Sequence, residues 1–316
     1  MNIPKFTKIP GAIAIDLDGT LVNSQTKLSG RNYHALQRCI EHGIPIIIAT
    51  SRPARIFNRI FPSSLTEHCS FVLMSGAIAA GKYPLSGYFK ETLPEKIIRD
   101  IINTALEYDP NVRVTIEIEG YEFGTNWKWD KETLWQRNSA TPEMILSLEE
   151  AISRKPCKIA LGNTNILPLA EILENQFGKD ISIVGGKFVS ALVNPLLNIT
   201  AKNATKPEAL KKLLTSHGIT LGETMAFGDD LPDLEMLQAC GMPVAMANAF
   251  PEIKSVCTYD TASNDEDGVA CVLEQIYIHR RARHVELCPS GFFRSYCSSN
   301  QTARSDGFSV RFCSFF

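Results

Sequence analysis

Three short runs of β-branched and apolar residues, separated by helix-length segments, constrain the fold more than any other feature of the chain. The runs cover residues 12–17, 44–49 and 71–74, and the first is followed by a predicted helix that ends at about Glu41, with Ser29 as its N-cap. Strand–helix–strand order implies right-handed crossovers between parallel strands. The sequence therefore predicts an α/β domain with a parallel sheet at the start of the chain.

The pattern changes at about Pro84 and stays different until about Pro195. Within this stretch helices and strands are predicted in two sets, at residues 95–107, 113–118, 144–153, 158–161, 167–177 and 181–184. Alternating helices and strands then return, at residues 207–217, 224–227, 233–239 and 243–246. We therefore expect a doubly wound, Rossmann-like α/β core of residues 1–83 and 196–280. An inserted α+β domain of residues 84–195, with largely antiparallel strands, is expected to interrupt this core.

The composition is that of an ordinary globular protein. Of the 316 residues, 44% are hydrophobic and 21% are charged, and the net charge of −2 gives no electrostatic reason to expect nucleic acid or an anionic membrane as partner. Nine cysteines lack the paired spacing of a metal site, so we expect reduced and mostly buried thiols. No run approaches the ~18 apolar residues of a membrane span, and the N-terminus lacks a signal-peptide core. These features predict a cytoplasmic location.

Residues 281–316 differ from the rest of the chain because they contain arginine but no lysine, many serine and phenylalanine residues, and no regular period. They predict an irregular, poorly ordered tail. Since no motif described below falls in this tail, truncation after about residue 280 is expected to leave turnover intact. A truncated protein that folds but loses activity would show that the tail contributes to the site.

Two aspartates stand at the end of the first predicted strand, in the run Ile13–Thr20. Side chains two positions apart on a strand share a face, so Asp16 and Asp18 are expected to project into the crevice beyond the strand ends, where ligands bind in open α/β sheets. A carboxylate beside Mg²⁺ can attack phosphorus, and a second carboxylate can protonate the leaving oxygen and then activate water. The alternative is a simple turn after the strand, but the apolar run before it favours catalysis.

A second acidic cluster, Asp229 and Asp233, follows another predicted strand and opens a helix. Hard oxygen ligands from two strand ends suit Mg²⁺, which binds few protein carboxylates and keeps several waters. Acidic residues at a helix start also act as caps, and for Asp233 this alternative is as strong as metal binding. Asp229 follows Gly228 at the strand end, which favours the metal interpretation.

Polar residues close the second predicted strand, and a lysine precedes a later helix. The hydroxyl and backbone N–H groups of Thr50 and Ser51 can hold phosphoryl oxygens at a strand-to-helix junction. Lys206 can neutralise the charge that a phosphoryl group develops. Each of these residues alone is weak evidence for a phosphate site. The order in which they follow the aspartates along the chain gives the evidence its weight.

Four elements in this order resemble the motifs of the haloacid dehalogenase (HAD) superfamily: Asp16/Asp18, Thr50, Lys206 and Asp229/Asp233. The local sequence is similar to that of the Cof-type (type IIB) sugar phosphatases in four segments, residues 48–53, 205–210, 246–254 and 264–269. The resemblance covers about residues 11–277. The insert lies between Thr50 and Lys206, where this family carries a C2 cap domain.

The resemblance implies a role for each matching residue. Asp16 would be the nucleophile and a Mg²⁺ ligand, and Asp18 the general acid and base, with its backbone carbonyl on the metal. Thr50 and the Ser51 amide would hold the phosphoryl group. The remaining residues would complete the site, with Lys206 stabilising the phosphoryl group, Asp229 binding Mg²⁺ and Asp233 nearby.

The implied activity is hydrolysis of a small phosphate ester, such as a sugar phosphate, through an aspartyl-phosphate. Asp18 argues against a dehalogenase, which needs no general acid at that position. The chain departs from the family pattern at Pro232, where the family usually has an asparagine that contacts the phosphoryl group. This change leaves open a phospho-ligand-binding or regulatory protein with weakened catalysis. A phosphomutase also remains an alternative, and phosphate release rather than isomer interconversion would exclude it.

Overall fold

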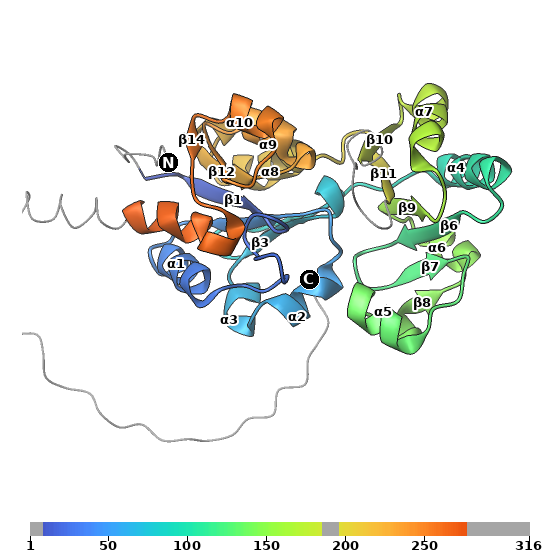
Figure 1. Cartoon of the computed structure of the whole chain (residues 1–316), viewed down its shortest axis with the longest axis horizontal. Coiled ribbons are helices and arrows are strands. Elements are labelled where there is room, and N and C mark those ends of the chain that lie inside the picture. Colours follow the sequence, from blue (N-terminus) through green and yellow to red (C-terminus); the bar gives the residue numbers. More distant parts are fainter. Residues whose placement is uncertain (1–8, 185–195, 277–316) are drawn as a thin grey trace, which may run out of the picture.

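The computed structural model describes residues 9–184 and 196–276, which form two units, each built around its own sheet (Figure 1). The larger sheet has eight strands in the order β14-β13-β12-β1-β2-β3-β4-β5, and the smaller has six in the order β10-β11-β9-β6-β7-β8. The predicted irregular tail, residues 281–316, lies outside the described residues. The α/β fold class with a Rossmann-like core is confirmed.

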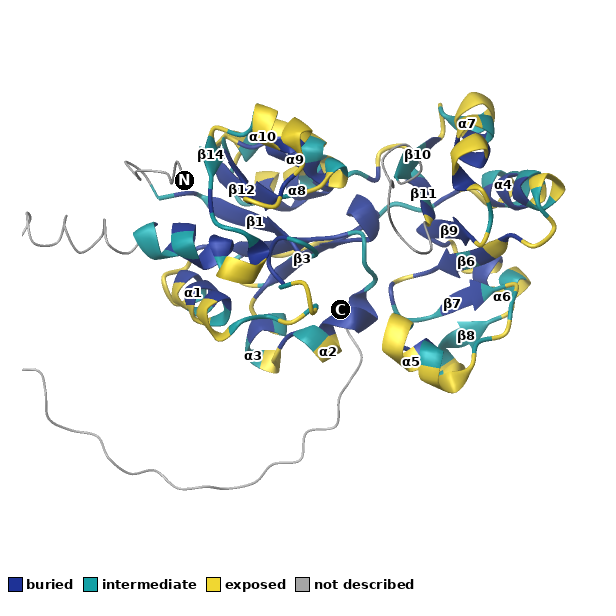
Figure 2. Cartoon of the chain, in the orientation of Figure 1, coloured by how far each residue is buried: buried dark blue, intermediate teal, exposed yellow. Residues whose placement is uncertain are grey.

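The larger sheet has a parallel centre. Its parallel strands are β1 (Ala12–Asp16), β2 (Ile46–Ala49), β3 (Ser70–Leu73), β12 (Thr224–Gly228), β13 (Met242–Ala245) and β14 (Tyr259–Asp260). Every residue of β1, β2, β3 and β12 is buried, which explains their continuous apolar sequences (Figure 2). Two strands that the sequence did not predict, β4 (Ile78–Ala80) and β5 (Tyr88–Lys90), extend one edge in antiparallel orientation.

Helices lie on both sides of this sheet, as a doubly wound fold requires (Figure 1). One side carries α1 (Gly30–Glu41), α2 (Phe57–Ile60) and α3 (Ser63–Thr66), and the other carries α8 (Lys206–Thr215), α9 (Leu234–Ala239) and α10 (Pro251–Val256). Short 3₁₀ turns, η1 (Ala54–Ile56), η2 (Met74–Gly76), η4 (Leu221–Glu223), η5 (Leu231–Asp233) and η6 (Asn264–Glu266), lie between these elements. The predicted cap of α1 is confirmed, because the Ser29 hydroxyl accepts from the Asn32 amide at 3.0 Å.

The smaller sheet is mainly antiparallel, as the sequence indicated, with a parallel pairing of β7 and β8. Its strands are β6 (Arg113–Glu117), β7 (Phe123–Thr125), β8 (Ile145–Leu146), β9 (Lys158–Gly162), β10 (Ile181–Val184) and β11 (Leu197–Ala201). Its helices are α4 (Glu95–Tyr108), α5 (Lys131–Asn138), α6 (Leu148–Ser153) and α7 (Ile166–Phe177). Buried side chains of α4, α6 and α7 pack with the sheet into a hydrophobic core separate from that of the larger sheet.

The helix predicted over residues 144–153 is wrong in its first part. A 3₁₀ turn, η3 (Pro142–Met144), and strand β8 occupy this region, and α6 begins only at Leu148. The side chain of Ser147 accepts a hydrogen bond from the Glu150 amide at 3.2 Å and so fixes the helix start. A serine cap inside an apolar run therefore overrides the helical period.

The chain crosses between the two sheets a few residues after each predicted domain limit. Strand β5 still belongs to the larger sheet although it follows residue 83, and β11 belongs to the smaller sheet although it follows residue 195. The division into a core and an inserted domain stays a prediction. None of the described helices is both long and apolar enough to cross a membrane.

Six cysteines fall in the described part of the chain, and none of these six takes part in a disulfide bond. Cys39, Cys69, Cys157 and Cys240 are buried, as the sequence indicated. Burial raises the pKa of Cys69 to about 12. This burial supports a packing role for these thiols.

Candidate active site

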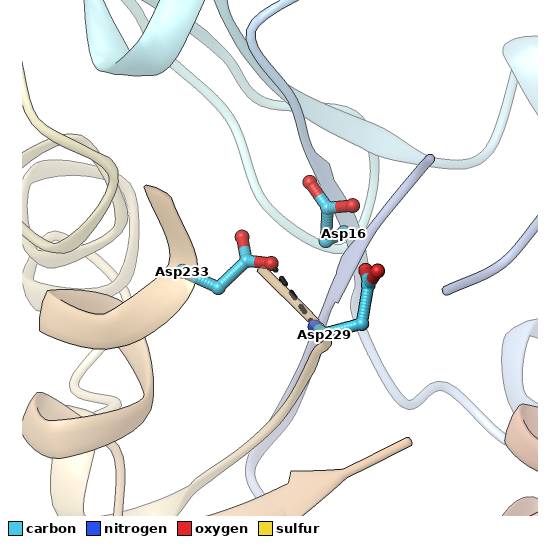
Figure 3. A group of neighbouring side chains, drawn as sticks. All are labelled: Asp16, Asp229 and Asp233. Carbon is cyan, nitrogen blue, oxygen red and sulfur yellow. Dashed lines mark hydrogen bonds between the residues drawn. The ribbon is translucent and has the colours of Figure 1, made fainter. Parts of the chain in front are cut away.

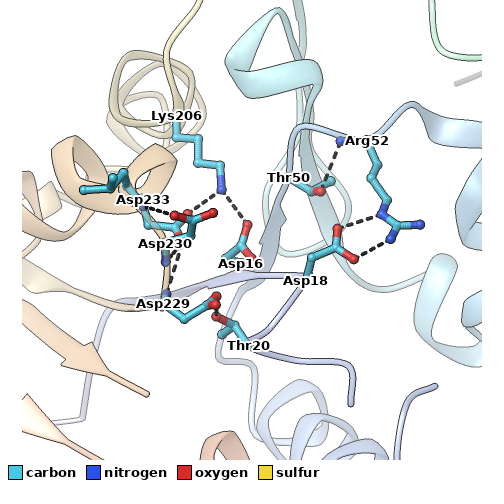
Figure 4. Close-up of polar contacts among 10 residues, drawn as sticks. Asp16, Asp18, Thr20, Thr50, Arg52, Lys206, Asp229, Asp230 and Asp233 are labelled. Atoms are coloured by element: carbon cyan, nitrogen blue, oxygen red, sulfur yellow. Dashed lines mark hydrogen bonds and ion pairs between the residues drawn. The ribbon is translucent and has the colours of Figure 1, made fainter. Parts of the chain in front are cut away.

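The site forms where neighbouring parallel strands end at the same edge of the larger sheet. β12, β1 and β2 lie side by side in register, with Ile15 opposite both Phe227 and Ile48. Asp16 ends β1, Thr50 follows β2 and Asp229 follows β12, so residues distant in sequence meet at one edge (Figure 4).

Lys206 links two of the aspartates. It lies at the start of α8, whose first turn is capped by the Thr205 hydroxyl. Its Nζ donates to Asp16 Oδ1 and to Asp233 Oδ1, both at 2.6 Å, and its side chain is 4% exposed. Burial disfavours the charged ammonium, but Asp16 and Asp233 outweigh this effect and raise the pKa of Lys206 above its usual range. Lys206 is therefore positively charged at the centre of the site.

Three carboxylates gather around this lysine. One oxygen each from Asp16, Asp229 and Asp233 lies within 4.8 Å of the others (Figure 3). Burial and the nearby Asp233 raise the pKa of Asp16 well above its usual range, although Lys206 acts in the opposite direction. Burial raises the pKa of Asp229 to about 7. Two of these carboxylates are buried and Asp229 is half-buried. A group of hard oxygen donors that resist carrying adjacent negative charges fits a divalent cation such as Mg²⁺.

Asp233 also holds the loop after β12 in place. Its Oδ2 accepts from the backbone amides of Asp229 at 3.2 Å and Asp230 at 3.3 Å, while its Oδ1 accepts from Lys206. The alternative role that the sequence offered for Asp233, a cap at a helix start, is thus present at η5. The same side chain positions Lys206 and belongs to the carboxylate group.

Two further polar residues support Asp229. Thr20 Oγ1 donates to Asp229 Oδ1 at 2.7 Å. Asn248 Nδ2 donates to the Gly19 carbonyl at 2.8 Å and makes a longer contact with Asp229 Oδ2 at 3.5 Å. Gly19 has φ of 74°, and a Cβ at this position would lie 2.2 Å from an Asp229 oxygen, so only glycine fits here. Sequence reasoning gave Thr20 and Asn248 no role, although both lie within motifs that it used.

Asp18 has a different environment from Asp16. Its two oxygens accept from Arg52 Nε at 2.6 Å and from Arg52 Nη2 at 2.5 Å, and its side chain is 43% exposed against 10% for Asp16. Asp18 therefore faces the accessible side of the site, paired with an arginine to which the sequence gave no role. The sequence signal that could have indicated a role for Arg52 was its position directly after Thr50 and Ser51.

The loop after β2 is tightly held. Thr50 Oγ1 accepts from the Arg52 amide at 3.1 Å, the Thr50 amide donates to the Val72 carbonyl at 2.8 Å, and the Thr50 carbonyl accepts from the Ser75 amide at 3.0 Å. The Ser51 carbonyl accepts from Lys158 Nζ at 3.0 Å. Thr50, one of the predicted phosphate-binding residues, thus lies beside Asp18 and Arg52 (Figure 4).

A cavity of about 1000 Å³ adjoins Lys206. Residues of both units line it, from α7 and β10 on one side and from α8 and η5 on the other. Pro232 belongs to this lining and is the second residue of η5. A proline has no amide hydrogen and no side-chain donor, so Pro232 offers no hydrogen-bond donor where the HAD motif has an asparagine.

Fold and site together define a hydrolase of the HAD class. The family model for haloacid dehalogenase-like hydrolases matches residues 13–273, and the chain belongs to this family. It is 31% identical over 271 residues to a candidate phosphatase of Haemophilus influenzae, a match that covers 84% of this chain and 97% of that protein.

Solved structures agree with this assignment. A haloacid dehalogenase-like hydrolase from Bacteroides thetaiotaomicron superposes with a TM-score of 0.71 and 26% identity, covering 85% of this chain and all of that chain. The subclass IIB sugar phosphatase BT4131 shares the fold with a TM-score of 0.69 at 24% identity, over 84% of this chain and 99% of that chain. The chain is a phosphatase of the HAD type that acts on phosphorylated substrates.

Proposed function

We propose that this protein is a Mg²⁺-dependent phosphatase that hydrolyses a small phosphorylated metabolite, a sugar phosphate or a similar ester, through an aspartyl-phosphate on Asp16. The observation that carries the proposal is the buried contact of Asp16 with Lys206 inside the three-carboxylate group. This arrangement supplies a nucleophile, a fixed positive charge and oxygen donors for a cation at one strand edge.

Mg²⁺ would be held by the Asp16 and Asp229 carboxylates and by the Asp18 backbone carbonyl, with Asp233 close by. When bound, it would offset the negative charge of the phosphoryl oxygens and of the clustered carboxylates. The raised pKa of Asp229 and its hydrogen bond from Thr20 support a ligand role for this residue.

In the proposed first step the Asp16 carboxylate attacks phosphorus, and the P–O bond to the leaving group breaks while Asp18 protonates the leaving oxygen. In the second step Asp18 takes a proton from water, which attacks the aspartyl-phosphate and releases phosphate. Arg52 donates to both oxygens of Asp18 and so fixes the position of this carboxyl group. Thr50, the Ser51 amide and Lys206 would hold the phosphoryl oxygens throughout.

The substrate class is supported by the cavity beside Lys206. Glu171 and Asn175 of α7 and Ser182 of β10 line its wall on the side of the smaller sheet. Acceptors and donors of this kind can bind the hydroxyl groups of a sugar. The fold likeness to a subclass IIB sugar phosphatase agrees with this choice. We propose that residues 84–195 form a cap that selects the substrate.

The proposal is tested by measuring phosphate release from a panel of phosphate esters, including hexose and pentose phosphates, with Mg²⁺ and with EDTA. We expect Mg²⁺-dependent release from several sugar phosphates and no isomer interconversion. Equal release in Mg²⁺ and EDTA, or isomerisation without release, would contradict the proposal.

The proline in the cavity wall leads to a prediction of increased activity. Pro232→Asn is expected to raise kcat/KM by up to about 10²-fold, because it restores a side-chain donor of the kind that stabilises charge on oxygen in a transition state. Steady-state kinetics on the best ester of the panel would measure this. Pro168→Asn, which adds the same amide to the opposite wall, is the matched control and should leave kcat/KM unchanged. If folded Pro232→Asn shows no gain, the missing donor does not limit the reaction.

A further inference from the structure

A lysine of the smaller sheet reaches the predicted phosphate-binding loop of the larger one. Lys158 begins β9, and its Nζ donates to the Ser51 carbonyl at 3.0 Å. The residue is 6% exposed and lies far from Ser51 in sequence. A buried ammonium is costly unless it is hydrogen-bonded and near negative charge, so this placement needs a compensating partner.

The negative charge near Lys158 comes from Glu117, which belongs to a buried ion pair that also joins the two units. Arg55 of η1, in the larger unit, donates to both oxygens of Glu117 at the end of β6, each at 2.7 Å. Both side chains are nearly inaccessible, at 1% and 6% exposure. Arg55 Nε also donates to the Asn138 carbonyl at 2.9 Å, and its guanidinium lies 4.4 Å from the centre of the Phe123 ring. Charge, hydrogen bonds and packing thus fix the smaller unit against the start of η1.

Lys158 and Glu117 lie directly opposite each other on adjacent antiparallel strands, so both side chains lie on the same face of the smaller sheet. Burial, and to a lesser degree Arg55, lower the pKa of Lys158 to about 8, while Glu117 acts in the opposite direction. The negative charge of Glu117 therefore stabilises two cations, Arg55 of the larger unit and Lys158 of the smaller unit. Of these two, Lys158 contacts the predicted phosphate-binding loop.

The contact acts on one peptide group of that loop. The Ser51–Arg52 peptide is held at both ends, since its carbonyl accepts from Lys158 and its N–H donates to Thr50 Oγ1. The orientation of this peptide sets the direction of the Ser51 backbone and the starting position of the Arg52 side chain. Arg52 in turn holds both oxygens of Asp18.

We propose that Lys158 is a positioning residue, through which the smaller unit holds the Thr50–Arg52 loop in the geometry that binds the phosphoryl group. The inference rests on the proposed function, because it assumes that this loop binds phosphate. Displacement of catalytic groups by about 1 Å can cost about 10²-fold in rate. A single hydrogen bond to the loop is therefore sufficient to affect turnover without touching substrate.

The test compares Lys158→Met with the wild-type protein. The substitution keeps a long unbranched side chain and removes the hydrogen-bond donor and the charge. The probes are p-nitrophenyl phosphate as substrate and inorganic phosphate as competitive inhibitor, both with Mg²⁺. We expect kcat/KM to fall by about ten- to a hundredfold, and the inhibition constant of inorganic phosphate to rise by about tenfold. Lys202→Met is the matched control, because Lys202 Nζ makes the same kind of bond to the Gly178 carbonyl at 2.8 Å, at an exposed position in the smaller unit.

A purely structural role would lower the melting temperature of Lys158→Met and leave the inhibition constant of inorganic phosphate unchanged. That result would overturn the inference. Lys158→Gln, which keeps a donor without the charge, should lie between wild type and Lys158→Met, and it decides the question if the methionine variant does not fold. The wild-type protein could hydrolyse no ester while Lys158→Met still binds inorganic phosphate more weakly than wild type does. That pair of results would contradict the proposed function and leave the positioning role in place.

Discussion

Replacement of Asp16 by asparagine is expected to reduce phosphate release by about 10⁴-fold or more, because the substitution removes the nucleophile while leaving the shape of the site intact. Asp16 is the buried carboxylate that Lys206 holds at 2.6 Å. Of the three clustered carboxylates, Asp233 also contacts this lysine, but only Asp16 lies at the end of β1. The effect would appear in kcat, measured on the best ester of the panel with saturating Mg²⁺.

A stability measurement controls for unfolding of Asp16→Asn. The fold raises the pKa of Asp16, so its ionised form is less favourable in the folded than in the unfolded protein. This ionisation therefore lowers stability at neutral and alkaline pH. The metal-free asparagine variant is expected to be at least as stable as wild type at about pH 8 in thermal melts. Activity within about tenfold of wild type in the folded variant would refute the role of Asp16.

Replacement of Lys206 by methionine is expected to destabilise the metal-free protein by about 3–5 kcal/mol, because it leaves the buried Asp16 and Asp233 without their cation. The fold raises the pKa of Lys206, so its protonated form contributes stability that is lost only as the pH rises through that raised value. Urea unfolding in EDTA would measure the loss. Turnover is expected to fall by about 10²- to 10³-fold in addition.

The destabilisation of Lys206→Met should depend on pH and on Mg²⁺. Because the pKa of Asp16 is raised, a lower pH favours its neutral form, so the loss at about pH 5 should be smaller than at about pH 8. Mg²⁺ should restore part of the stability by binding the same oxygens. Lys212→Met is a suitable control, since Lys212 lies on the same helix and pairs with Glu91 at a partly exposed position. Equal losses at both pH values would show that the carboxylates do not depend on Lys206.

The sequence predicted the centre of the fold well because strands buried on both faces are continuously apolar. β1, β2 and β12 fall within about two residues of their predicted places, and the serine cap of α1 was predicted at the correct residue. The last two strands on one side of the larger sheet, β4 and β5, were missed, since they are three residues long and carry no clear period. Short strands depend on a neighbouring strand that the sequence does not identify.

Part of the site was predictable for a related reason. Residues at the ends of adjacent parallel strands must meet, so the convergence of Asp16, Thr50 and Asp229 follows from strand order alone. The contact of Asp18 with Arg52 and the reach of Lys158 to Ser51 do not follow from strand order. These contacts depend on side-chain direction and on how the two units pack against each other.

The covalent intermediate is the central claim, and its most direct test is to trap it. Rapid acid quench of the enzyme with Mg²⁺ and a ³²P-labelled ester, followed by proteolysis and mass spectrometry, would locate the phosphoryl group. We predict that the label lies on the peptide containing Asp16, that it decays at the rate of turnover in a chase with unlabelled ester, and that it is absent from Asp16→Asn. Labelling of a different peptide, or phosphate release at full rate with no labelled protein at any time, would contradict the account.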